Sequence, residues 1–93
     1  MDLGQRIYYT GDMANAEDFG TIIAVREPNK YAPLSYDIRL DDGRLFKGVW
    51  DLSFQPSPGR RFWPLDEWEA DRQKRIEAMK ADMKRLQIKR VGG

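Results

Sequence analysis

Two arginines are followed directly by two aromatic residues in the segment Arg60–Trp63. Guanidinium groups bind phosphate oxygens and aromatic rings stack on nucleobases, so this combination is typical of a surface that contacts nucleic acid. The same segment also fits a structural arrangement, in which the arginines flank a buried Phe62–Trp63 pair. With the basic residues near the end of the chain, the candidate nucleic-acid site comprises Arg60, Arg61, Lys80, Lys84 and Arg85.

A second set of side chains, Tyr8, Asp12 and Tyr31, is suited to binding a protein partner. Tyr31 lies in a loop with two prolines, and we expect this loop to hold the ring in solvent. Tyr8 precedes Tyr9 in an expected strand, so their rings point to opposite faces, and one of them lies outside the core or under the expected C-terminal helix. Asp12 lies in a polar loop, and exposed aromatic rings near acidic loops favour a protein interface.

Catalytic chemistry has little support in this composition. The chain has no histidine and no cysteine, which removes the commonest general base, the strongest nucleophile and most ligands of transition metals. Asp41 and Asp42 resemble a carboxylate pair, but the glycine that follows indicates an ordinary turn. The acidic residues of segment 12–18 lack the spacing of a calcium-binding loop. We therefore expect a non-enzymatic protein without a metal or cofactor.

Charge is unevenly distributed along the chain, although the net charge is only +1 over 93 residues. Residues 1–59 carry six Lys or Arg against nine Asp or Glu, whereas residues 72–93 carry eight basic and two acidic side chains. This uneven distribution fits a partner that charge attraction guides to one end of the protein. It also fits the helix dipole, which favours acids at the start of a helix and bases at its end.

The length and composition predict one domain with a single core. No apolar run approaches the roughly 20 residues that span a bilayer, and residues 1–6 lack the hydrophobic stretch of a signal peptide. The absence of cysteine fits a reducing compartment. We expect a cytoplasmic protein without a membrane segment.

Short strands are expected over residues 5–9, 20–26, 36–40 and 44–50, where β-branched and aromatic residues recur. Segment 20–26 has apolar residues on both faces, which favours a central strand that is covered twice. Residues 60–63 form either a last short strand or an extended lead-in to a helix.

The hairpin at Asp41–Gly43 has two competing registers. A two-residue turn pairs Leu40 with Leu45 and leaves aromatic rings on the polar face. A three-residue turn with a left-handed glycine pairs Ile38 with Phe46 instead. Because a slip of one residue moves every side chain to the other face, burial favours the second register. That register places these residues on one side: Tyr36, Ile38, Leu40, Phe46 and Trp50.

A long helix is expected from Leu65 to about Ile88, with acids in its first turns. Leu65 and Trp68 are expected to dock on the strands. An apolar stripe continues through Ile76, Met79, Met83 and Leu86. Its spacing of three and four residues is helical. The stripe favours packing back on the strands or a weak antiparallel homodimer; otherwise the protein is a monomer.

The strand pattern resembles the SH3-like small barrels of the Tudor and KOW type over residues 4–54. The matching positions are Gly11, Asp12, Gly20, Thr21, Ile22, Tyr36, Leu40, Asp42, Gly43 and Trp50. The resemblance implies a domain that binds peptides, nucleic acid or other proteins through aromatic and loop surfaces.

The fold class expected is therefore mainly β with a C-terminal α-helix. Residues 1–59 would form the SH3-like barrel and residues 60–93 a basic helix packed partly on it, within one domain. The favoured function is a bacterial or phage-type accessory module that binds a protein, as an inhibitor or regulator. The alternative is a nucleic-acid-binding protein that uses Arg60, Arg61 and the basic helix.

Overall fold

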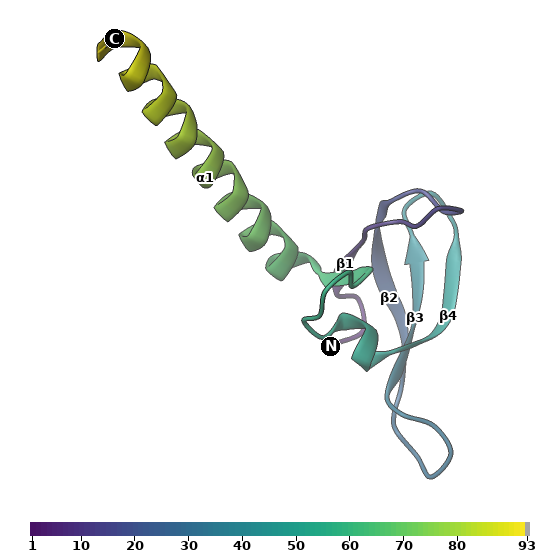
Figure 1. Ribbon diagram of the computed structural model, residues 1–93. Coiled ribbons are helices and arrows are strands. Elements are labelled where there is room, and N and C mark those ends of the chain that lie inside the picture. The colour runs from purple at the N-terminus through teal and green to yellow at the C-terminus, as the bar shows by residue number, and fades with distance from the viewer. Residues whose placement is uncertain (93) are drawn as a thin grey trace.

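In the computed structural model, a small curled sheet is followed by one long helix (Figure 1). The structure describes the backbone of residues 1–92 and the side chains of residues 1–84. The elements are β1 (Arg6–Tyr9), β2 (Asp18–Arg26), β3 (Ser35–Leu40), β4 (Leu45–Trp50), the 3-10 helix η1 (Asp51–Phe54), β5 (Phe62–Pro64) and α1 (Leu65–Gly92). The protein is thus mainly β with a C-terminal helix, as the sequence predicts.

The five strands form one antiparallel sheet in the order β4-β3-β2-β1-β5. The sheet curls into a half-barrel, and the rings of Phe46 on β4 and Phe62 on β5 meet at 5.7 Å between centroids. Residues 62–64 are a strand rather than only a lead-in, because they pair with β1. The last strand, β5, therefore leads into α1 with no loop between them.

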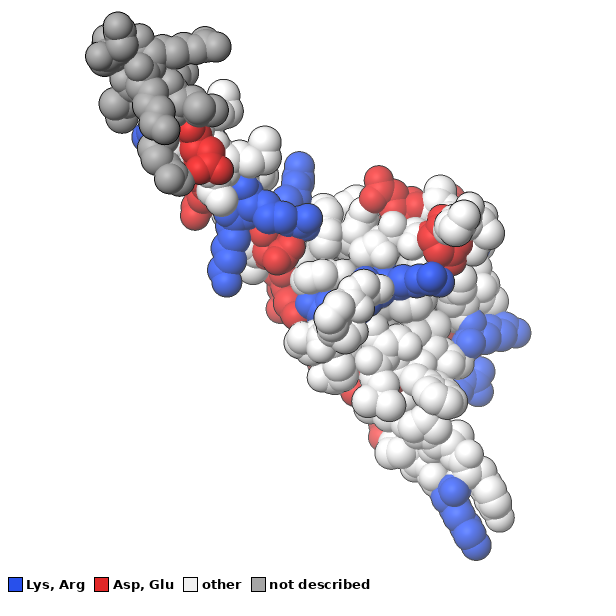
Figure 2. Space-filling model, viewed as in Figure 1, with Lys and Arg blue, Asp and Glu red and all other residues white. Residues whose placement is uncertain are grey.

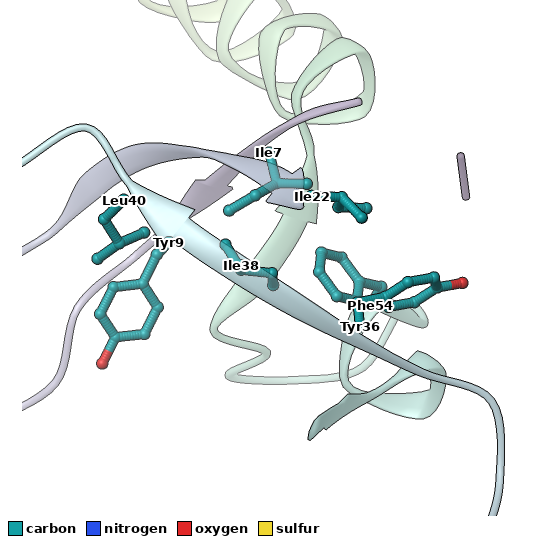
Figure 3. Packing of buried hydrophobic residues seen from close by; sticks show 7 residues of the cluster. All are labelled: Ile7, Tyr9, Ile22, Tyr36, Ile38, Leu40 and Phe54. Atoms are coloured by element: carbon teal, nitrogen blue, oxygen red, sulfur yellow. The ribbon is translucent and has the colours of Figure 1, made fainter. Parts of the chain in front are cut away.

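The core lies on the inner face of the half-barrel (Figure 3). Its members come from β1, β2, β3 and η1: Ile7, Tyr9, Ile22, Tyr36, Ile38, Leu40 and Phe54. The Tyr36 hydroxyl donates to Asp51 at 2.6 Å, so its polar end is satisfied despite burial. Alternating apolar residues in β3 supply three of the seven side chains, which is why this strand anchors the sheet.

The hairpin between β3 and β4 has the register expected from burial. Ile38 pairs with Phe46, and the Leu40 amide donates to the Arg44 carbonyl at 2.8 Å. Gly43 has a φ of 97°, in the left-handed region that side chains with a Cβ avoid. The three-residue turn is confirmed.

Trp50, however, does not join the core, and the expectation for it is wrong. A bulge in β4 lies opposite Asp37, with Gly48 at a φ of 66°. The Asp37 carboxylate stabilises it by accepting the Gly48 amide at 3.0 Å. The extra residue puts Val49 opposite Tyr36, so Val49 packs on the core while Trp50 is 55% exposed.

β2 occupies the middle of the sheet, but over residues 20–26 only one of its faces is covered. Ile22 is buried, whereas Ile23 is exposed at a second register shift, between Ile22 and Ala24. The expectation that segment 20–26 is covered twice is wrong, because α1 docks mainly on β1 and β5 and meets β2 only at Phe19, before this segment.

Helix α1 docks through its first turns, as expected for Trp68. The Trp68 ring stacks on Tyr8 of β1 at 4.2 Å and meets Phe19 of β2 edge-on at 5.6 Å. Beyond this contact the helix projects from the sheet and gives the molecule a length of 66 Å (Figure 1).

Met79 and Met83 of the apolar stripe do not pack back on the strands, so this alternative is wrong for them, and the weak homodimer stays a prediction. Met79 is 64% exposed and Met83 is 58% exposed. The helix is straight in Figure 1, and its docked turns aim the rest of it away from the half-barrel. Leu86, the last residue of the stripe, lies outside the described side chains.

Candidate protein-interaction site

A groove of about 840 Å³ lies between α1, the loop that joins β1 to β2, and the chain before β5. We call it the helix groove. Tyr8 and Trp68 stack at its floor. Its walls include Asp12, Met13, Glu17, Arg61, Trp63, Asp71, Arg72, Arg75, Ile76 and Met79. The groove therefore combines an aromatic floor with exposed methionines and several charged groups.

The Asp12 carboxylate organises the loop wall of the groove. It accepts the amides of Ala14 and Asn15, both at 2.8 Å, and the Tyr9 hydroxyl at 2.7 Å. Gly11 must be glycine here, since its φ is 81° and a Cβ would lie 2.8 Å from the Glu17 nitrogen. The hydrogen bond from Tyr9, followed by those from the loop, lowers the pKa of Asp12 to about 2.

The free energy of unfolding at acid pH should depend on the Asp12 carboxylate. Because folding lowers the pKa of Asp12, its ionised form stabilises the fold above about pH 4 and that contribution is lost toward pH 2. We expect the difference in free energy of unfolding between the natural protein and Asp12→Asn to be constant above about pH 5 and to shrink below about pH 4. A carboxyl NMR titration of Asp12 with its midpoint near 4 would contradict this assignment.

Tyr8 lies under the helix, which is one of the two positions that its place in β1 predicts. Its ring is buried against Trp68, and its hydroxyl donates to Glu17 across the groove. Burial, and then this hydrogen bond, raise the pKa of Tyr8 to about 12. Tyr8 thus forms the floor of the groove, and Trp68 covers it.

Arg60 adopts the structural arrangement that the sequence left open. Only 5% of its side chain is exposed, and its guanidinium stacks on the Trp63 ring at 3.5 Å. It donates to the Phe54 carbonyl at 2.7 Å and pairs with Glu67 of α1. These contacts tie η1, β5 and α1 together and leave little of Arg60 for a ligand.

Three of the other candidate cations, Arg61, Lys80 and Lys84, are exposed but lie in different places. Arg61 faces the groove and pairs with Asp12 at 3.4 Å. Lys80 and Lys84 lie on the projecting part of α1, and the Arg85 side chain lies outside the described residues. Figure 2 shows basic side chains around the helix where it leaves the half-barrel, with acidic ones among them.

Tyr31 is 89% exposed, as expected, at the tip of an ordered loop. The Asn29 side chain accepts the amides of Tyr31 at 2.7 Å and Ala32 at 3.0 Å. This loop joins β2 to β3 at the end of the sheet far from α1 (Figure 1). The structure therefore brings Tyr8, Asp12 and Arg61 together and leaves Tyr31 apart.

Sequence reasoning missed Met13, Arg72 and Arg75 as members of the same site. Arg72 and Arg75 follow Trp68 by four and seven residues, which puts them on the docked face of α1. This helical spacing could have identified both arginines from the sequence. No sequence pattern pointed to Met13, because only the folded loop brings it opposite the helix.

Comparison with protein-family models, with curated protein sequences and with solved structures finds no match for this chain. Within the described part of the chain, α1 included, no helix has the apolar length needed to cross a lipid bilayer.

Proposed function

We propose that the half-barrel is an SH3-like small barrel of the Tudor and KOW type that acts as a protein-interaction module. Five short strands around a single core and the Asp41–Gly43 hairpin support the fold assignment. In this proposal the protein is a non-enzymatic bacterial or phage-type accessory factor in the cytoplasm, where it inhibits or regulates its partner.

The observation that carries the proposal is the uncovered apolar stripe of α1. The face that docks through Trp68 continues past the half-barrel to Met79 and Met83, and both are more than half exposed. Across the groove, Met13 is fully exposed. Flexible, polarisable methionines are common on surfaces that adapt to a protein partner, and contiguous exposed apolar surface marks an interaction site.

An affinity capture from host lysate, with nuclease present, tests the proposal. The natural protein should retain a specific partner, and Met79→Asp should lose it because a charge is placed in the apolar contact. Ala81→Asp is the matched control, since Ala81 is exposed on the opposite face of the same helix. Equal capture by all three proteins, or none by any, would count against a protein-binding groove.

Nucleic-acid binding is the second candidate function. Arg61, Lys80 and Lys84 are exposed, and residues 72–84 carry five basic against two acidic side chains. With Arg60 and Arg85, these are the cations expected from the sequence to contact phosphates. A gel-shift assay at low salt separates the two functions, because phosphate contacts give binding that weakens steeply with salt. If the protein is a protein-interaction module, we expect no shift.

A further inference from the structure

We propose that the helix groove binds an acidic amphipathic helix of a partner protein, an inference that rests on the proposed function. The apolar part of the site has the shape for such an occupant. From Trp68 to Met83 the stripe runs about 22 Å, the length of a helix of about 15 residues. Ile76 and Met79 lie along it, and Met13 on the loop forms the opposite wall. An apolar strip of this length suits a helix laid alongside it.

The groove has more hydrogen-bond donors than its own carboxylates use. Arg61, Arg72 and Arg75 all line it, and each guanidinium carries five N–H groups. Among the described residues, Arg61 and Arg75 each make one ion pair, with Asp12 and Asp71. Arg72 lies over the Trp68 ring at 5.6 Å. Most of these N–H groups therefore face solvent and can bind an incoming acceptor.

The carboxylates of the groove have fewer free hydrogen-bonding sites than its arginines. Asp12 accepts bonds from its own loop and from Tyr9, Glu17 accepts the Tyr8 hydroxyl, and Asp71 pairs with Arg75 at 2.9 Å. These contacts fill Asp12, but Glu17 and Asp71 each keep about three of the four acceptor sites of a carboxylate, roughly six sites against about thirteen N–H groups left on the three arginines. A partner that supplies carboxylates beside an apolar face matches this surplus of arginine donors.

A second copy of α1 does not match the charges of the groove. With Ile76, Met79 and Met83 as the contact positions of heptads, the flanking positions are Arg75, Lys80 and Asp82. A parallel pair would place Arg75 of one copy against Lys80 of the other. An antiparallel pair would oppose the two copies of Lys80 to each other and likewise those of Asp82. Like charges at these positions disfavour self-association.

A phosphate backbone matches only half of the site. It would satisfy the arginines, but it has no apolar face to cover Met13, Ile76 and Met79. An amphipathic acidic helix uses both parts, with its apolar ridge on the methionines and its carboxylates on the arginines.

Two synthetic peptides test the inference on the full chain. Both are labelled helices of about 15 residues with leucines on one face, flanked by glutamate in one and by lysine in the other. We expect the glutamate peptide to bind at least about tenfold more tightly in fluorescence anisotropy. Arg72→Glu combined with Arg75→Glu should reverse that preference. Lys74→Glu changes an exposed residue of α1 that does not line the groove, and it should leave the preference unchanged.

Reversal of preference is a readout that a merely structural role of the arginines would not produce. The inference fails if the lysine peptide binds as well as the glutamate peptide, if neither binds, or if a single-stranded DNA oligomer occupies the groove through the same arginines. It also fails if sedimentation shows α1-mediated dimers. If the peptides fail while Met79→Asp still abolishes capture of a partner, the proposed function stands and only the acidic class of partner is excluded.

Discussion

Ile38→Ala is expected to lower the free energy of unfolding by about 3 kcal/mol or more. Ile38 is fully buried in β3, where it pairs with Ile22 on one side and with Phe46 on the other. Truncation removes its apolar contacts and leaves a cavity between two strands that cannot close without moving the sheet. A small domain is stabilised by only about 5–15 kcal/mol in total, so the loss should be visible in the thermal midpoint.

Ile23→Ala provides the matched control for this change. Ile23 lies one residue after Ile22 but points to solvent, so its truncation should cost less than about 1 kcal/mol. Urea unfolding of both variants measures the difference directly. Equal costs would mean that the inner face of the half-barrel is not the core, or that β2 is covered on its other face as the sequence alone suggests.

The β3–β4 hairpin shows what local patterning can predict. The alternation of Tyr36, Ile38 and Leu40 fixes which face of β3 is buried. Only one turn length then keeps Phe46 on the same face, and Gly43 supplies the left-handed residue that this turn requires. Each step depends on residues that are close in sequence, which is why the register followed from the sequence alone.

The bulge a few residues later depends on distant groups. Asp37 is buried and accepts bonds from Arg26 and from the Gly48 amide, so an acid in β3 determines where β4 changes face. Nothing near Trp50 in the sequence reveals that its partner strand carries a buried carboxylate. A two-residue periodicity continued through Gly48 therefore placed Trp50 on the wrong side.

The sequence predicted only part of the candidate site, for a similar reason. Tyr8, Asp12 and Arg61 were identified by residue type, but their assembly depends on β5 pairing with β1. The adjacent arginines take different roles because β5 turns Arg60 onto Trp63 and Arg61 toward Asp12. Sequence alone could name two arginines; only the strand pairing decides which one faces the groove.

Trp68→Ala is expected to lower the free energy of unfolding by about 3 kcal/mol and to release α1 from the sheet. Trp68 is the one aromatic residue in the sequence of α1, and it supplies both the stack on Tyr8 and the edge contact with Phe19. Trp50→Ala is the matched control, because Trp50 is more than half exposed on β4 and should cost less than about 1 kcal/mol.

Loss of the stack should also be visible at Tyr8 itself. Burial is the main cause that raises the pKa of Tyr8 to about 12, so exposure of the ring in Trp68→Ala should lower that pKa toward the ordinary value of about 10. An NMR titration of labelled tyrosine measures this shift, and Trp50→Ala should leave it unchanged. If the pKa of Tyr8 and the melting temperature both stay unchanged in Trp68→Ala, then α1 is an independent arm and the helix groove does not exist as a site.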